Sequence, residues 1–161
     1  MKIKLITANA IVAALYVIVG FLIQPIAFGA IQFRVPELFN HLIVFSKKYF
    51  WGIALGVLIT NLYSPLGWYD LVFGVGQSVI TMLLMFGIMK YVKGTIWRMI
   101  VNTLVFSFTM FIIAFELHLA FGLPFFFTWL TCAIGELTVM GIGIPIMYFI
   151  NKRVKFKEII E

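Results

Sequence analysis

The side chains best suited to bind a small molecule gather in one half of an otherwise apolar chain, and Glu136 stands out among them. It lies about nine residues into a long apolar segment, or roughly 14 Å deep if that segment is a membrane-spanning helix. Burying an acid at such a depth costs about 2.5 kcal/mol or more. Glu136 is therefore expected to bind a ligand, or to stay protonated and hydrogen-bonded within the protein. Its companions are Gln32, Arg34, Glu37, Asn61, Asp70, Gln77, Glu116 and His118.

Four of these companions lie near expected helix ends, where several explanations compete. Capping or contact with water explains Glu37, Asn61 and Asp70 as well as ligand binding does. Arg34 and Glu37 are three residues apart at a helix entrance, so they could simply pair with each other. Both the structural and the ligand-binding roles stay open for this group.

The remaining polar candidates lie further inside the apolar segments. Gln77 is expected at about the level of Glu136, to which its amide could donate a hydrogen bond. Glu116 lies about four residues from the outer end of its segment, and both roles are open for it. His118, about 200° further round the helix, faces away from Glu116. We expect structural roles for His118 and for His41, which is a candidate helix-packing residue.

Aromatic residues crowd the same half of the chain. An aromatic belt at the membrane interface is the ordinary explanation for them. A planar ligand would also use one or two aromatic rings as stacking walls. Trp68 and Trp129, each near the start of a long apolar segment, are the candidates for such contacts.

Patterns for catalysis and for metal binding are absent from the sequence. There is no Walker A motif, no Gly-x-Ser-x-Gly nucleophile elbow and no His-Glu-x-x-His pair. The single cysteine, Cys132, lies in an apolar run and is expected to be a buried structural thiol. We expect no enzyme, no cofactor and no metal site.

The composition is that of an integral membrane protein. The 161 residues are 63% hydrophobic and 11% charged, less than half the charge of an ordinary soluble domain. No basic folded surface for a nucleic acid is visible, and contact with anionic lipid explains the net charge of +6 more simply. Residues 1–161 are expected to form one all-α domain, a bundle of six transmembrane helices. The expected helices are 4–23, 36–47, 49–63, 68–91, 96–120 and 127–152.

The charges predict the orientation of this bundle. With six helices, every Lys and Arg except Arg34 falls on one side of the membrane. Short cytoplasmic loops collect Lys and Arg, so both termini are expected in the cytoplasm. A basic start followed by an apolar run also fits a signal peptide. We expect a retained helix instead, because the charge sorting depends on it. The Lys and Arg residues assigned to the cytoplasmic side are Lys2, Lys4, Lys47, Lys48, Lys90, Lys93, Arg98, Lys152, Arg153, Lys155 and Lys157.

Two pairs of small residues have the spacing that lets helices approach closely. Ala10 and Ala14 are four apart in the first helix, and Gly52 and Gly56 are four apart in the third. Packing inside the bundle explains such pairs as well as docking of a partner does.

One region resembles a known family. It contains QPIAFGAIQFRVPELF from Gln24, followed by GIALGVLITNLYSPLGWYDLVFG ending at Gly74. These blocks are similar to the QueT family of queuosine-precursor uptake proteins, which are substrate-binding S components of energy-coupling factor (ECF) transporters. The chain length and the six expected helices agree with this resemblance.

The resemblance implies a function. An S component captures its ligand, here a 7-deazaguanine base or queuine, at the outer face of the cell membrane. It delivers the ligand inward when two separate ATPase subunits hydrolyse ATP. It docks through small residues of its first helix, matched by Ala10 and Ala14, against a transmembrane coupling subunit. The candidate substrate-binding residues are Gln32, Arg34, Glu37, Asn61, Trp68, Asp70, Gln77, Glu116, Trp129 and Glu136.

Two other classes compete with this interpretation. A self-contained secondary transporter or channel would need a coupling-ion site, for which Glu136 could carry a proton. A small intramembrane enzyme is disfavoured, because no basic or histidine partner is expected near Glu136 at that depth.

Overall fold

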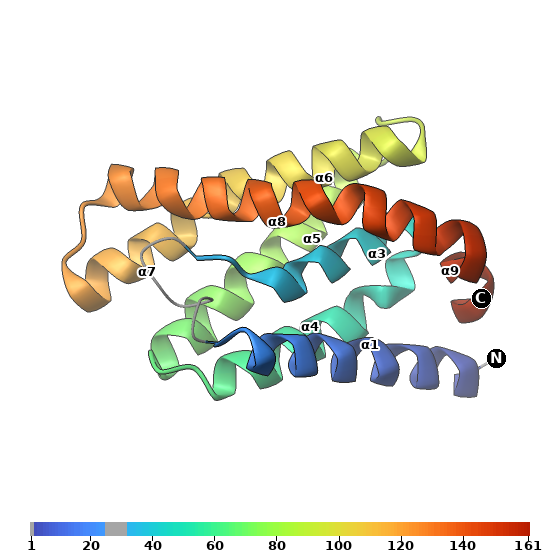
Figure 1. Cartoon of the computed structure of the whole chain (residues 1–161), viewed down its shortest axis with the longest axis horizontal. Helices are drawn as coiled ribbons and strands as arrows, with labels where there is room; N and C mark the ends of the chain where they lie inside the picture. Colours follow the sequence, from blue (N-terminus) through green and yellow to red (C-terminus); the bar gives the residue numbers. More distant parts are fainter. Residues whose placement is uncertain (1, 25–31) are drawn as a thin grey trace.

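The computed structural model describes residues 2–24 and 32–161, and within them every regular element is helical. The loop positions Pro25, Ala27, Phe28, Gly29 and Ile31, used in the sequence comparison above, lie outside the described residues. Figure 1 shows an elongated bundle whose helices run along one common direction, with the two chain ends marked at the same end. The elements are α1 (Lys2–Leu22), η1 (Val35–His41), α3 (Leu42–Phe45), η2 (Lys47–Tyr49), α4 (Phe50–Leu62), η3 (Asp70–Gly74), α5 (Val75–Ile88), α6 (Thr95–Thr109), α7 (Phe111–Phe121), α8 (Phe125–Val154) and α9 (Phe156–Ile160).

Four helical stretches are long and apolar enough to cross a membrane. They are Lys2–Leu22, Asp70–Ile88, Thr95–Phe121 and Phe125–Val154. The segment Val35–Phe45 is apolar but shorter, and α4 has 13 residues. The chain is therefore an all-helical, multi-pass membrane protein. The expected shortness of the second and third helices is confirmed.

Three expected helices differ in detail from the structure. The second is mostly a 3₁₀-helix, η1, with only four α-helical residues after it. The fourth begins with a π-helical turn, η3, before α5. The fifth is interrupted at Met110, where α6 ends and α7 begins. These 3₁₀ and π segments and the break at Met110 are short and lie within apolar runs. Hydrophobic periodicity therefore does not distinguish them from a continuous α-helix.

Glycines hold α1 and α4 together. A methyl group added at Gly56 would lie 2.7 Å from Cβ of Tyr16, and one at Gly52 would lie 2.7 Å from the carbonyl oxygen of Asn9. The side chain of Asn9 also accepts a 2.7 Å hydrogen bond from the Gly52 backbone N–H, near the start of α4. The Gly52 and Gly56 pair therefore packs inside the bundle.

The basic loops gather at the end that carries the termini. Lys47, Lys48, Lys90 and Arg98 line one hollow together with Glu161. Arg98 donates hydrogen bonds from Nε to the Val92 carbonyl and from Nη2 to the Met89 carbonyl, just beyond α5. The acidic candidates lie in other parts of the bundle, where they are buried.

Candidate functional site

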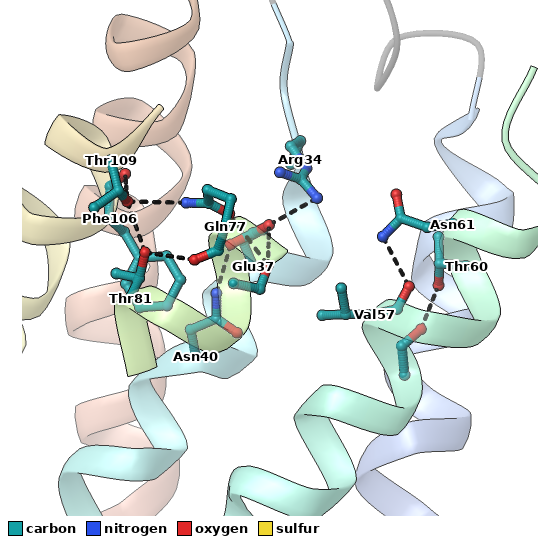
Figure 2. Close-up of polar contacts among 12 residues, drawn as sticks. Arg34, Glu37, Asn40, Val57, Thr60, Asn61, Gln77, Thr81, Phe106 and Thr109 are labelled. Atoms are coloured by element: carbon teal, nitrogen blue, oxygen red, sulfur yellow. Dashed lines mark hydrogen bonds and ion pairs between the residues drawn. The ribbon is translucent and has the colours of Figure 1, made fainter. Parts of the chain in front are cut away.

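The 3₁₀ winding of η1 aligns three polar side chains. Residues three apart lie above one another in a 3₁₀-helix, which places Arg34, Glu37 and Asn40 on one line. Nη2 of Arg34 lies 3.1 Å from Oε1 of Glu37, and the Asn40 amide donates a 2.5 Å hydrogen bond to Oε2 (Figure 2). The Ser78 hydroxyl donates a third, longer bond of 3.4 Å to Oε1. Both carboxylate oxygens of Glu37 are thus satisfied, and the pairing with Arg34 that the sequence left open is present.

Gln77 joins the break between α6 and α7 instead of contacting Glu136. Its amide donates a 3.0 Å hydrogen bond to Oγ1 of Thr109, the last residue of α6. The hydroxyls of Thr81 and Thr109 lie 2.7 Å apart, and Thr109 donates to the Phe106 carbonyl (Figure 2). The hydrogen bond considered between Gln77 and Glu136 is not formed, because the Gln77 amide faces α6.

Glu116 and Glu136 accept no hydrogen bond from a protein donor among the described residues, and the carboxyl of each lies beside another acid, Asp70 and Glu37 respectively. Both side chains are 0% exposed, and none of their four carboxylate oxygens is paired. Nε2 of Gln32 and Nη1 of Arg34 are buried and unpaired as well. Buried polar groups are nearly always hydrogen-bonded, so a group of orphaned acceptors and donors requires an explanation. Two explanations fit: a proton shared within each pair of neighbouring carboxyls, or a bound polar ligand.

The charges of this region interact with one another. Arg34 interacts electrostatically with Glu37, Glu136 and Asp70. Glu136 interacts in turn with Glu37, and Glu116 with Asp70. The acids therefore form two pairs of neighbouring carboxyls, Glu37 with Glu136 and Asp70 with Glu116, and η1, η3, α7 and α8 contribute to them.

Gly135 allows the chain segment that precedes η1 to pack against α8. A methyl group at Gly135 would lie 2.3 Å from the backbone oxygen of Gln32. Only glycine allows this approach, and Glu136 is the next residue. The contact therefore brings the Gln32 backbone against α8 one residue before Glu136.

Asp70 is held by the turn between α4 and η3. Oδ2 of Asp70 accepts a hydrogen bond from the Ser64 hydroxyl, and Ser64 Oγ accepts another from the Leu66 backbone N–H at 3.1 Å. Gly67 has φ +60°, a left-handed conformation that suits glycine in a turn. This turn, residues 64–67, orients a buried acid.

The other candidates have local partners. The Asn61 amide donates to the Val57 carbonyl at 2.8 Å (Figure 2), and its oxygen lies against Gly74. Trp68 is 61% exposed and stacks on Tyr69. The Trp129 indole N–H donates to the Phe108 carbonyl within an aromatic cluster. None of these contacts joins the three side chains to the carboxyls of Glu116 or Glu136. Their ligand roles stay predictions.

Several residues were not singled out by sequence reasoning. Asn40, Ser78, Thr81 and Thr109 complete the polar network around Glu37 and Gln77. The spacing of three from Glu37 to Asn40 was a usable signal, but only for a 3₁₀-helix. Gly135 beside Glu136 was a second usable signal.

The histidines and the cysteine have the structural placements expected for them. His41 is buried, with Nε2 2.9 Å from the Met140 carbonyl of α8. His118 Nδ1 lies 2.7 Å from the Leu123 carbonyl, across the turn that ends α7. Cys132 is a buried free thiol. The described residues contain no group of three His, Cys, Asp or Glu side chains that could hold a metal ion.

The two small residues of the first helix lie on its outer surface. Ala10 and Ala14 are both exposed, whereas their neighbours Ala13 and Val12 are buried. This stripe of α1 therefore faces away from α4 and remains free for contact with lipid or protein.

Comparison with known proteins agrees with this architecture. The family model described as QueT transporter matches residues 6–152. The chain is also similar to the queuosine precursor transporter QueT of Lactococcus lactis subsp. cremoris (strain MG1363). The two are 37% identical over 160 residues, which cover 92% of this chain and 93% of the relative. No solved structure matches the chain. The match to nearly the whole chain shows that this multi-pass membrane protein belongs to the QueT transporter family, a family of transporters and not of enzymes.

Proposed function

We propose that this chain is the substrate-binding S subunit of an ECF-type importer in the cell membrane. It captures a queuosine precursor, a 7-deazaguanine base or queuine, at the outer face. It then releases the ligand inside when partner subunits hydrolyse ATP. The outer face is the side to which the buried acids belong, and the basic loops and both termini lie in the cytoplasm.

The observation that carries the proposal is the set of buried, unpaired polar atoms. No protein donor reaches the oxygens of Glu116 and Glu136, and Nε2 of Gln32 and Nη1 of Arg34 are unpaired; Oδ1 of Asn40 and Oδ1 of Asn102 are the other unpaired buried atoms among the described residues. A buried polar atom left without a hydrogen bond costs about 1–3 kcal/mol, and more when it is charged. A ligand that satisfies these atoms recovers that free energy on binding.

A guanine-like edge has the matching chemistry. Its ring N–H and exocyclic amine are donors that suit a carboxylate such as Glu136. Its carbonyl oxygen is an acceptor that suits the free N–H groups of Gln32 and Arg34. Glu37 serves this site by holding Arg34 in place, since both of its own oxygens are already occupied. Asn61, Trp68, Asp70, Gln77 and Trp129 complete the proposed set of substrate-binding residues.

The transport step is assigned to partner proteins. The sequence contains no Walker A motif, so a coupling transmembrane subunit and two ATPase subunits would supply the energy. The exposed stripe of Ala10 and Ala14 on α1 is the proposed contact with the coupling subunit, because small residues allow close helix approach.

Ligand titration and reconstitution test this proposal together. The purified chain in lipid nanodiscs is titrated with 7-deazaguanine bases, queuine, guanine and unrelated vitamins. The same chain is then placed in liposomes with and without the partner subunits. We expect binding of 7-deazaguanines by the chain alone and uptake only with partners and ATP. Uptake by the lone chain, driven by a proton gradient, would instead establish a secondary transporter.

The docking surface has its own test. We expect Ala14→Trp to abolish uptake by the assembled transporter and to leave ligand binding unchanged, because the added ring prevents close helix contact. Ile142→Trp, at an exposed position of α8, is the control that also introduces a tryptophan ring. Normal uptake by Ala14→Trp would remove α1 from the docking surface.

A further inference from the structure

Four basic side chains line one hollow at the end of the bundle that carries both termini. They come from different elements: Lys47 and Lys48 from η2, Lys90 from the turn after α5, and Arg98 from α6. The volume of the hollow is about 490 Å³, within the range of about 300–1,000 Å³ that is usual for small-molecule sites. Glu161 is the one acidic residue among the described residues that line it. None of the proposed substrate-binding residues lines it, so the proposed function leaves this hollow without a role.

Two of the four cations are held in place by backbone carbonyls at the end of α5. Arg98 donates a 2.9 Å hydrogen bond from Nε to the Val92 carbonyl and a 3.1 Å bond from Nη2 to the Met89 carbonyl. Nζ of Lys47 lies 3.5 Å from the Phe86 carbonyl and 5.2 Å from the centre of the Phe86 ring. The last carbonyls of a helix carry partial negative charge, which these cations compensate. Neither cation forms an ion pair with an acid among the described residues, so both retain their charge at the wall of the hollow.

The other two cations, Lys48 and Lys90, have no side-chain partner in the part of the chain that the structure describes. Both are exposed, and their ammonium groups form neither an ion pair nor a hydrogen bond there. Beside them, the buried hydroxyl of Ser46 accepts a 3.4 Å hydrogen bond from the Lys48 backbone N–H and donates none to another described residue. The hollow therefore offers two free ammonium groups and a hydroxyl, which are donors that suit the oxygens of a phosphate.

The rest of the lining is apolar. Ile43, Val44, Phe45 and Met89 lie in the same wall as the cations. A soluble anion gains nothing from such a surface, because it has no apolar part to bury. A phospholipid has one, since its phosphate is joined through glycerol to acyl chains. The combination of cations and apolar side chains therefore favours a lipid over a free phosphate.

Aromatic residues place this hollow at the level of the lipid headgroups. Trp51, Tyr91 and Trp97 are 68%, 87% and 64% exposed, and each lies within three residues of a basic lining residue. Tryptophan and tyrosine are enriched where a membrane meets water. Basic pockets between transmembrane helices at that level bind anionic headgroups.

We infer that this hollow binds the headgroup of an anionic phospholipid, for which phosphatidylglycerol is the probe. Lys48, Lys90 and Ser46 donate to the phosphate, and the fixed charges of Lys47 and Arg98 add to the attraction. The bound lipid ties the basic turns of the bundle to the membrane surface. This site does not depend on the proposed function, because no queuosine precursor takes part in it.

Native mass spectrometry of the purified full chain tests this site. The protein in neutral detergent is mixed with phosphatidylglycerol or with phosphatidylcholine that has the same acyl chains, and the fraction that carries lipid is measured. We expect the wild type to bind phosphatidylglycerol at least about tenfold more tightly. The double variant Lys48→Gln, Lys90→Gln should lose about fivefold for each charge removed, and about twenty- to thirtyfold in all. Both side chains lack partners, so an unchanged melting temperature is expected and shows that this variant folds.

A matched control separates the hollow from the overall charge of this end. The double variant Lys152→Gln, Lys155→Gln removes the same charge outside the hollow and should keep the preference for phosphatidylglycerol. Equal binding of the two lipids by the wild type, or equal losses in the two double variants, would overturn the inference.

Two further measurements distinguish other occupants. Glycerol phosphate should not displace the bound lipid, and displacement by it at the same concentration as phosphatidylglycerol would assign the hollow to a soluble phosphate ester instead. Uptake by the assembled transporter is measured for the same variants. Lost uptake in Lys48→Gln, Lys90→Gln with an unchanged lipid preference would overturn the lipid site and assign the hollow to a partner subunit.

Discussion

Two ion pairs of this protein have the same spacing and almost the same length, yet their surroundings differ completely. Arg34 and Glu37 are three residues apart with 3.1 Å between charged atoms, and Lys155 and Glu158 are three apart at 3.2 Å. The side chains of the first pair are 10% and 0% exposed, and those of the second are 63% and 69% exposed. Burial, not geometry, therefore decides what each pair contributes.

The comparison explains why the buried acids indicate a function. An exposed pair exchanges hydration for a weak contact and contributes about 0–1 kcal/mol. A buried pair has lost its hydration, so each partner depends on the other. Glu37 meets this requirement through Arg34, Asn40 and Ser78. Glu116 and Glu136 are equally buried and have no basic partner or protein donor among the described residues, and the proposed function gives them a ligand as partner.

The largest effect is expected at the buried pair. Glu37→Gln should lower the free energy of unfolding by about 3–5 kcal/mol, because it removes the carboxylate in direct contact with the buried Arg34 guanidinium. Thermal unfolding of the protein in detergent measures this change. The double variant Arg34→Met, Glu37→Leu should regain much of the stability and still lose ligand binding. If the free energy of unfolding of Glu37→Gln lies within about 1 kcal/mol of the wild-type value, water reaches the pair more readily than the structure indicates.

An intermediate effect on stability is expected at Gly135, where the segment that precedes η1 packs against α8. Gly135→Ala should cost about 1–3 kcal/mol through overpacking, because the new methyl group meets the Gln32 backbone. It should also weaken ligand binding by displacing Gln32. Gly141→Ala on the same helix has open space around it and should be neutral or slightly stabilising. Equal melting temperatures for the two variants would argue against the close approach at Gly135.

The smallest effect is expected at the exposed pair. Glu158→Gln should change the free energy of unfolding by less than about 1 kcal/mol, since water solvates Lys155 when its partner is removed. Added salt should reduce even this difference, because exposed charges are screened. The same unfolding measurement, at low and high salt, checks it. A loss as large as that of Glu37→Gln would show that burial does not separate the two pairs.

Sequence reasoning located the helices better than it located the contacts. Long apolar runs predicted the spanning segments, and depth within such a run identified Glu136. The spacing of three raised the Arg34–Glu37 pair as one of two open roles, and the structure contains that pair. These features depend on local composition and periodicity, which a single sequence displays.

The missed features depend on how separate elements meet. Gln77 was expected near Glu136 by depth, but its amide turns toward Thr109, because the direction round a helix is set by packing. Asn40 reaches Glu37 because η1 winds as a 3₁₀-helix. The break at Met110 coincides with the Thr109 hydroxyl bonded to Phe106, Gln77 and Thr81. No periodic pattern predicts such tertiary hydrogen bonds.

The central claim is that the unpaired carboxyl of Glu136 recognises the ligand, and one titration tests it most directly. Glu136→Gln keeps the shape of the side chain and replaces an acceptor with a donor. Losing one charged hydrogen bond costs about 1.5–3 kcal/mol, so the affinity for a 7-deazaguanine base should fall about ten- to a hundredfold. Calorimetry on the folded variant, with an unchanged melting temperature in the absence of ligand, gives the predicted result. An affinity within about threefold of the wild type would contradict the account and remove Glu136 from the site.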